Sequence, residues 1–181
     1  MVNLFQDKTG RKVYRIVDNA PNGIMLSAMK VVKGQMLQRA GELNTKVFGV
    51  ETGLLRSYTI DEKGKEHIFA FANEGWTIAD LCEVSDPCEL FIDALEASTI
   101  TAIDKEERKR QVDINTVVNR IFVLQKRVIM LMSASAMERY KHFLRTYPHI
   151  VQRVSQKMIA SYLGVTPEAL SRVRKALSKA E

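Results

Sequence analysis

Four polar residues near the end of the chain have the types and spacing of side chains that contact DNA. They are Glu168, Ser171, Arg172 and Lys175, which recur at helical spacing and therefore share one face of a helix. An arginine on such a face donates two hydrogen bonds to guanine, and a carboxylate accepts one from the amino group of cytosine. A serine reaches either a base or a phosphate. The spacing therefore predicts a surface that contacts base edges, with Arg172 and Glu168 as its most specific members.

Basic residues near this face are candidates for contacts with the phosphate backbone. They are Lys157, Arg174, Lys175 and Lys179. Residues 1–104 carry 11 Lys and Arg against 15 Asp and Glu, whereas residues 105–181 carry 16 against 6. An acidic first part and a basic second part favour two modules. The basic module would bind a polyanion. Alternatively, these basic residues belong to a helical surface that faces only solvent and binds no polyanion.

The elements that must position these residues are two short helices joined by a turn. Ser155 is a natural N-cap for the first helix, and Gly164 suits a left-handed turn at its end. Thr166 caps the second helix, which has Pro167 at its first position. The inward positions are Met158, Ile159 and Tyr162 in the first helix and Leu170, Val173 and Leu177 in the second. This pattern is typical of a helix-turn-helix, whose second helix enters the major groove. A helical hairpin that serves only packing is the alternative.

A long helix precedes this segment, because residues 105–147 contain no Gly or Pro. One apolar stripe in it follows the alternating 3-4 spacing of a coiled coil: Ile114, Val117, Ile121, Leu124, Val128 and Leu131. A second stripe consists of Val118, Phe122, Ile129 and Met132. We predict a helix over about Asp113–Ser135 that dimerises through Val117, Ile121, Leu124, Val128 and Leu131; burial of both stripes inside one monomer is the alternative. A dimer would set two base-reading helices about 34 Å apart on a near-palindromic site.

Residues 24–103 have the composition and turn rhythm of antiparallel β-structure. Asp61–Gly64 reads as a hairpin turn. Five glycines recur at intervals of 7 to 12 residues, namely Gly34, Gly41, Gly53, Gly64 and Gly75. The predicted strands cover Lys46–Val50, Leu54–Ile60, Glu66–Ala72, Leu90–Leu95 and Ser98–Ile103. The chain therefore divides into a β part at 1–104, a dimerisation helix region at 105–136 and a DNA-binding part at 137–181.

Other classes of protein lack support in the sequence. No run of 18 apolar residues is present, and charges throughout residues 1–20 leave no signal peptide, so a cytoplasmic location is expected. Cys82 and Cys88 are too few for a disulfide framework. The β part has a single histidine, and no serine has the surroundings of a nucleophile elbow. We therefore expect no enzyme, no metal and no other cofactor.

A β-rich part, a seam helix and a helix-turn-helix in this order resemble the Crp/Fnr family of bacterial transcription regulators. The resemblance is most specific in residues 154–177, where Glu168 and Arg172 fall at the positions of the family's base-reading Glu and Arg. It implies an α+β fold: an N-terminal antiparallel, jelly-roll-like β-roll of the cyclic nucleotide-binding type, a long dimerisation helix and a C-terminal helix-turn-helix domain. It also implies a homodimer on double-stranded DNA, with RNA polymerase and an unknown small-molecule effector as candidate partners. A ligand-sensing or protein-interaction module without direct DNA binding is the alternative.

The chain departs from this family at the effector pocket, which we assign to Trp76, Asp80, Cys88 and Glu89. In members that bind cyclic AMP, a Glu takes the ribose hydroxyl and an Arg of an Arg-Ser or Arg-Thr pair takes the phosphate. Here Asp80 replaces the Glu, and Cys88-Glu89 replaces the pair. A carboxylate at this place repels a cyclic phosphate, so cyclic AMP is not expected as effector unless an unaligned basic residue reaches in. The four cysteines of cluster-binding members are also absent, and residues 178–181 are too few for the family's β-hairpin wing.

Overall fold

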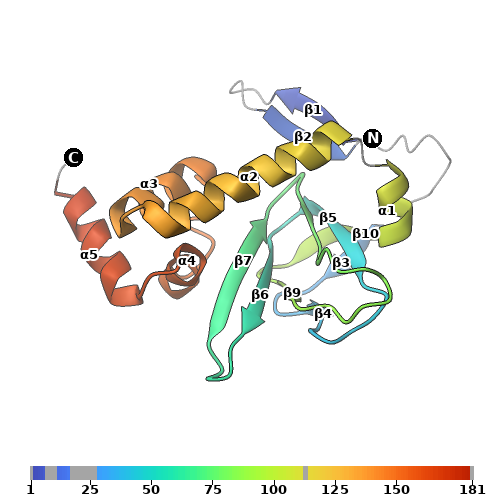
Figure 1. The fold of residues 1–181 in the computed structure, drawn as a ribbon, viewed down its shortest axis with the longest axis horizontal. Coiled ribbons are helices and arrows are strands. Elements are labelled where there is room, and N and C mark those ends of the chain that lie inside the picture. Colours follow the sequence, from blue (N-terminus) through green and yellow to red (C-terminus); the bar gives the residue numbers. More distant parts are fainter. Residues whose placement is uncertain (1, 7–11, 17–27, 112–113, 180–181) are drawn as a thin grey trace. The chain divides into compact units, whose positions relative to one another are not determined.

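The computed structural model describes residues 2–6, 12–16, 28–111 and 114–179 of the 181-residue chain. The chain forms two compact units. The first unit consists of Met1–Thr59 and Phe69–Gln111, and the second of Ile60–Ile68 and Val112–Glu181. Figure 1 shows the strands gathered in the first unit and the helices α3 to α5 gathered in the second. The predicted fold, an antiparallel β-roll followed by helices, is confirmed.

The first unit is built from two four-stranded sheets and a separate hairpin. One sheet has the order β3 (Met29–Val31), β10 (Ser98–Asp104), β5 (Lys46–Thr52) and β8 (Thr77–Ile78). The other has the order β4 (Met36–Gln38), β9 (Phe91–Ala94), β6 (Leu55–Ile60) and β7 (Glu66–Ala72). The hairpin pairs β1 (Val2–Gln6) with β2 (Lys12–Ile16) in antiparallel register. The five strands predicted from the sequence are confirmed to within two residues at each end.

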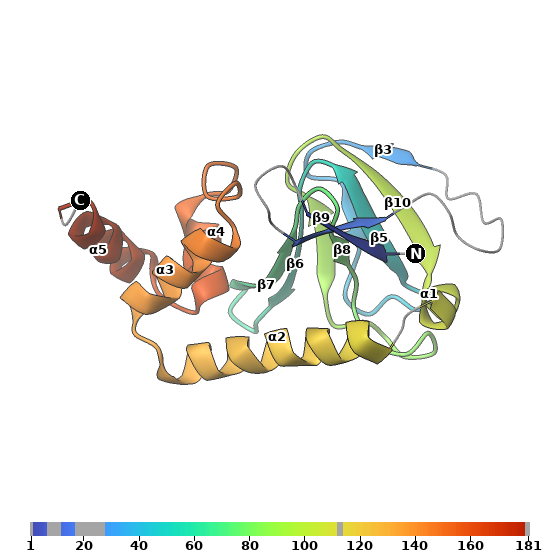
Figure 2. The same ribbon diagram turned by 90° about the horizontal axis from the view of Figure 1, so that it is seen from above.

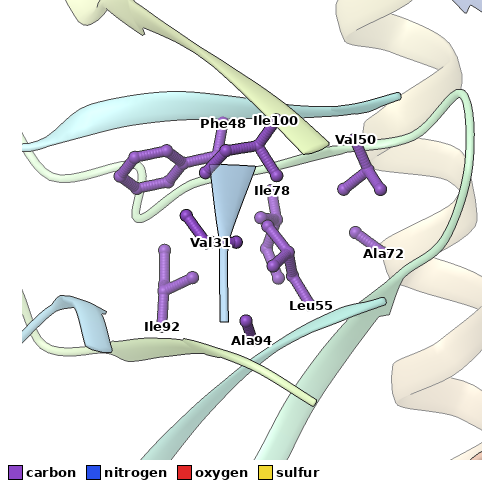
Figure 3. Close-up of a cluster of buried hydrophobic side chains, with 9 residues drawn as sticks. All are labelled: Val31, Phe48, Val50, Leu55, Ala72, Ile78, Ile92, Ala94 and Ile100. Atoms are coloured by element: carbon purple, nitrogen blue, oxygen red, sulfur yellow. The ribbon is translucent and has the colours of Figure 1, made fainter. Parts of the chain in front are cut away.

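Apolar side chains from both sheets form the core of the β-roll. The cluster consists of Val31, Phe48, Val50, Ile78 and Ile100 from one sheet and Leu55, Ala72, Ile92 and Ala94 from the other. Figure 3 shows these side chains directed into the space between the strands. Each fully buried Leu, Ile or Phe adds about 1.5–3 kcal/mol to the stability of the fold. The cluster therefore holds the two sheets together and fixes the loops that leave them.

A buried ion pair crosses the second sheet. Arg56 and Asp93 lie opposite each other in the register of β6 and β9, and each is only 7% exposed. Nε and Nη2 of the arginine donate to the two carboxylate oxygens, both at 2.9 Å. The guanidinium carbon also lies 4.2 Å from the centroid of the Tyr58 ring. Because each charge satisfies the other, removal of either would leave an unpaired buried charge.

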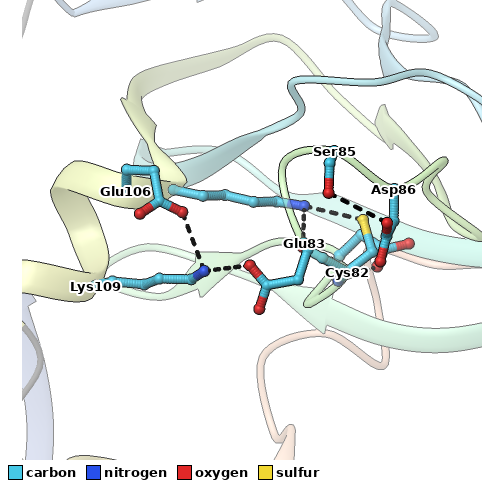
Figure 4. Close-up of polar contacts among 8 residues, drawn as sticks. Cys82, Glu83, Ser85, Asp86, Glu106 and Lys109 are labelled. Carbon is cyan, nitrogen blue, oxygen red and sulfur yellow. Dashed lines mark hydrogen bonds and ion pairs between the residues drawn. The ribbon is translucent and has the colours of Figure 1, made fainter.

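Helix α1 (Lys105–Gln111) follows β10 and is bonded to the loop between β8 and β9. The buried Lys105 donates through Nζ to the carbonyl oxygen of Cys82 at 2.9 Å, and its nitrogen lies 3.1 Å from the Cys82 sulfur. Lys109 pairs with Glu83 at 2.6 Å and with Glu106 at 3.0 Å (Figure 4). These contacts join the start of the helical part of the chain to the loop that carries the predicted effector residues.

The second unit contains α2 (Ile114–Ser133), α3 (Ala136–Thr146), α4 (Gln156–Leu163), α5 (Pro167–Leu177) and the hairpin tip Ile60–Ile68. Figure 2 shows α2 as one uninterrupted helix, in agreement with the prediction over 113–135. A capping box at Ser135 and Glu138 starts α3. Among the described residues, no helix is long and apolar enough to cross a membrane.

Candidate nucleic-acid interface and effector loop

The turn between α4 and α5 is formed by the residues that the sequence singled out. Ser155 caps α4 by accepting a hydrogen bond from the Met158 N–H at 3.2 Å. Gly164 ends the helix with φ of 63°, a left-handed conformation that costs glycine least. Thr166 caps α5 by accepting from the Ala169 N–H at 3.2 Å. Local hydrogen bonds therefore set the angle at which the second helix leaves the first.

The inward faces of α3, α4 and α5 form a core of their own. Its buried members are Tyr140, Phe143, Ile159, Ala160, Tyr162, Leu163, Leu170 and Val173. Phe143, Tyr147 and Tyr162 contact one another, with ring centroids 5.3 to 5.6 Å apart. Burial raises the pKa of Tyr147 far above its usual range, so its hydroxyl remains protonated. Because this face of α5 is buried in the core, the opposite face is directed outward.

The outward face of α5 carries all four residues of the predicted DNA-contacting face. Glu168, Ser171, Arg172 and Lys175 are exposed, and so are Lys157 and Lys179, whereas Arg174 is half-buried. Hydrogen bonds from its own backbone N–H and from Thr166, together with the nearby charge of Arg172, hold the pKa of Glu168 below its usual value. The helix therefore presents one carboxylate and several cations at neutral pH.

The predicted dimerisation stripe of α2 lies largely at the surface. Val117, Ile121 and Val128 are 40%, 59% and 54% exposed, and Leu124 and Leu131 are half-buried. The second stripe is exposed too, at Val118, Phe122, Ile129 and Met132. An apolar surface of this length on one chain is typical of a protein–protein interface.

The carboxylate of Asp80, in the predicted effector pocket, accepts three backbone hydrogen bonds. One carboxylate oxygen accepts the Cys82 N–H at 3.0 Å, and the other accepts the Glu89 and Leu90 N–H groups, both at 2.8 Å. Burial by itself would raise the pKa of Asp80, but these bonds outweigh it and the pKa lies below its usual value. The carboxylate is therefore ionised and held by the backbone of its own loop.

The other three predicted pocket residues have different surroundings. Cys88 is buried, its sulfur donates to the Arg39 carbonyl oxygen at 2.9 Å, and burial raises its pKa. Trp76 is half-buried and packs against the core cluster. The backbone N–H of Glu89 donates to Asp80, while the Glu89 side chain is exposed. Within the described ranges, no group of three or more His, Cys, Asp or Glu side chains is arranged to hold a metal.

Sequence reasoning missed two residues that position the interface. Arg139 of α3 donates to carbonyl oxygens at the ends of α2 and α4, namely those of Leu131 at 2.7 Å and Leu163 at 3.0 Å. Ser161 of α4 donates to the Glu66 carbonyl oxygen at 2.7 Å and accepts from the Ile68 N–H at 2.9 Å, which binds α4 to the hairpin tip of the same unit. Residue type alone does not single out either one, because Arg139 bonds to backbone carbonyl groups and the partners of Ser161 lie more than 90 positions away in the sequence.

Comparison with known proteins shows which families these features resemble. Residues 28–115 match the model of the cyclic nucleotide-binding domain. The fumarate and nitrate reduction regulatory protein of Vibrio cholerae is 29% identical to this chain, in a match that covers 83% of the chain and 68% of that protein. The anaerobic regulatory protein of Aggregatibacter actinomycetemcomitans is 26% identical, with 79% and 63% covered. The chain thus spans about two thirds of the length of these relatives.

Solved structures share the same fold. FixK2 from Bradyrhizobium japonicum superimposes with a TM-score of 0.73 at 21% identity, over 87% of this chain and 86% of that one. A transcriptional regulator of the Crp/Fnr family from Thermus thermophilus gives 0.70 at 14% identity, over 85% and 87%. The β-roll, the long helix and the helix-turn-helix occur in the same order as the sequence resemblance implied. The chain is thus similar, in sequence and in fold, to transcription regulators of the Crp/Fnr family.

Proposed function

We propose that this chain acts as a homodimer that reads a near-palindromic DNA site with α5. The observation that carries the proposal is the division of α5 into a buried face, with Leu170 and Val173, and an exposed polar face, with Glu168 and Arg172. A helix that served only packing would have no need of a row of exposed cations opposite its buried stripe. The parts at 1–104, 105–136 and 137–181 then act as effector domain, dimerisation region and DNA-binding domain.

In this mechanism some side chains contact bases and others contact phosphates. Arg172 donates to guanine O6 and N7, and Glu168 accepts from cytosine N4. Ser171 contacts a base or a phosphate. The cations Lys157, Arg174, Lys175 and Lys179 neutralise phosphates and thereby set the register of the protein on the duplex. The N-terminal end of α5 faces the bases, because Glu168 lies in its first turn.

Dimerisation supplies the second base-reading helix. The exposed stripe of α2 has coiled-coil spacing, and a second copy of the same stripe is its natural complement because cyclic dimers use one patch twice. Two copies of α5 would then read two half-sites about 34 Å apart. As a transcription regulator in the bacterial cytoplasm, the dimer would act on RNA polymerase, either by contact or by blocking its access to the promoter.

The experiment that tests this proposal is selection of bound sequences from a random pool of duplex DNA, with the purified chain alone. We expect an enriched motif with two inverted half-sites whose centres lie about one helical turn apart. Enrichment of a single, asymmetric half-site would contradict the dimer. Absence of any affinity for random DNA at low salt would contradict DNA binding and favour a protein-interaction module, because non-specific affinity for phosphates should be strongest there.

A further inference from the structure

The loop between β8 and β9 folds around the carboxylate of Asp80. Its oxygens accept three backbone N–H groups of this loop, those of Cys82, Glu89 and Leu90, at 2.8 to 3.0 Å. We refer to these three N–H groups as the anion cradle. Asp80 is only 6% exposed, so its charge is compensated chiefly by these donors and not by water. The cradle is thus a binding site for one negative charge, and a residue of the chain itself fills it.

Backbone N–H groups that converge from one loop are a common site for phosphate and other anions. The domain family matched by residues 28–115 is named for the binding of cyclic nucleotides, which carry such an anion. In this chain the donors that converge in the loop already bond to a carboxylate, with the short distances of charge-assisted bonds. A phosphate that approached the same N–H groups would have to displace Asp80 or bear the repulsion between two negative charges at close range.

The occupied cradle is also bonded to α1. Cys82 donates its N–H to Asp80, and its carbonyl oxygen accepts from the buried Lys105 at the first position of α1. Lys109, one turn further along α1, pairs with Glu83 of the same loop at 2.6 Å. A continuous set of hydrogen bonds and ion pairs therefore runs from Asp80 to the helix that follows the β-roll. An anion in the cradle fixes the loop, and the fixed loop holds the start of α1.

We propose that Asp80 is a built-in substitute for an anionic effector, and that this regulator binds DNA without a nucleotide. The first half of this proposal concerns the β-roll alone, whereas the second half rests on the function proposed above. The cradle of the native chain accepts no external phosphate, because its donors are satisfied and its occupant is ionised. Removal of the carboxylate turns the cradle into an empty site for a small anion.

The test uses the full chain, thermal unfolding and three probes: cyclic AMP, inorganic phosphate and acetate. We expect none of them to raise the Tm of the wild type in a saturable way. Asp80→Ala should lower the Tm by several degrees, and acetate or phosphate should restore part of that loss saturably, because either anion refills the cradle. Asp86→Ala removes an exposed carboxylate of the same loop and is the matched control, with little change in Tm and no recovery with anions. Saturable stabilisation of the wild type by cyclic AMP or phosphate would overturn the proposal.

Asp80→Asn keeps the volume of the side chain, and it replaces Asp80→Ala in the test if that variant does not fold. It should lower the Tm without recovery, since the amide fills the space that acetate needs. Asp80→Ala or Asp80→Asn with a wild-type Tm would overturn the idea that the carboxylate holds the loop.

DNA binding is measured separately, on a duplex selected with the wild type. The wild type should bind equally well with and without cyclic AMP, and Asp80→Ala should bind at least about tenfold more weakly until acetate is added. A wild type that requires a nucleotide for DNA binding contradicts effector independence. A wild type that binds no DNA contradicts the function proposed above. In that case the recovery of the Tm of Asp80→Ala by acetate still tests whether the cradle binds an anion.

Discussion

Arg139 and Leu163 are joined by a hydrogen bond of 3.0 Å from Nη1 of the arginine to the carbonyl oxygen of the leucine. The same guanidinium donates through Nη2 to Leu131 and through Nε to Ala134. One side chain of α3 therefore satisfies carbonyl groups at the C-terminal ends of both α2 and α4, where a cation is also favoured by the helix dipole. The orientation of the helix-turn-helix on the long helix depends on this residue.

Substitution of Arg139 should therefore destabilise the second unit. We expect Arg139→Ala to lower the free energy of unfolding by about 1–3 kcal/mol, because it leaves three carbonyl groups without their donor. Arg139→Lys should recover only part of the loss, since an ammonium cannot span three acceptors with the planar geometry of a guanidinium. Urea denaturation measures the change. Arg145→Ala removes an exposed cation from the same helix and should stay within about 0.5 kcal/mol of the wild type; an equal loss there would contradict the role of Arg139.

The contacts of α5 predict different effects for its two kinds of cation. Arg172→Ala should cost about 1–3 kcal/mol on a selected site and much less on random DNA, because its hydrogen bonds are to base edges. Lys175→Ala should weaken binding to both duplexes similarly and reduce the salt dependence of binding by about one phosphate contact. Fluorescence anisotropy at several salt concentrations measures both effects. Equal losses on selected and random DNA for Arg172→Ala would exclude it from base reading.

The sequence was informative wherever structure depends on neighbours along the chain. The helix-turn-helix could be predicted because Ser155, Gly164 and Thr166 each act on backbone groups within a few residues. The ends of β5, β6 and β7 could be predicted because Gly53, Gly64 and Gly75, each with a positive φ, mark the turns that follow them. The hairpin of β1 and β2 is not among the predicted strands, although Gly10 lies between them in the sequence.

Contacts between distant residues could not be predicted from one sequence. Arg56 and Asp93 are 37 positions apart, and from the sequence each charged residue would be predicted to lie at the surface. Asp80 was placed in the effector pocket on the basis of the family resemblance, but its donors were not foreseen. Two of the three donors are the backbone N–H groups of Glu89 and Leu90, and the position of a backbone group cannot be inferred from residue type. The sequence thus located the loop, and only the three-dimensional structure shows what occupies it.

The exposed stripe of α2 predicts that a single charge can separate the dimer. Val128→Glu introduces a carboxylate into the seam, where each copy would face its counterpart, so we expect a shift toward monomer. Val123→Glu is the matched control, because Val123 is equally exposed but lies on the opposite face of the helix from the seam. Sedimentation equilibrium measures the monomer–dimer balance of both variants. A dimer that persists in Val128→Glu and dissociates in Val123→Glu would assign the interface to the other face.

The low pKa of Asp80 predicts how the stability of the chain responds to acid. Burial alone would raise this pKa, but the N–H groups of Cys82, Leu90 and Glu89 lower it below the ordinary value of 3.8. A group with a depressed pKa in the folded state stabilises the fold fully above its pKa in the unfolded chain, and this contribution disappears as the pH falls through the folded value. The difference in unfolding free energy between wild type and Asp80→Asn should therefore be constant from about pH 8 to 5 and shrink below about pH 4. Urea denaturation across this range measures it, with Asp86→Asn as background. A difference that instead shrinks as the pH rises from 5 to 8 would mean that Asp80 is protonated in the folded chain. The backbone N–H groups would then bind a neutral carboxylic acid and not an anion.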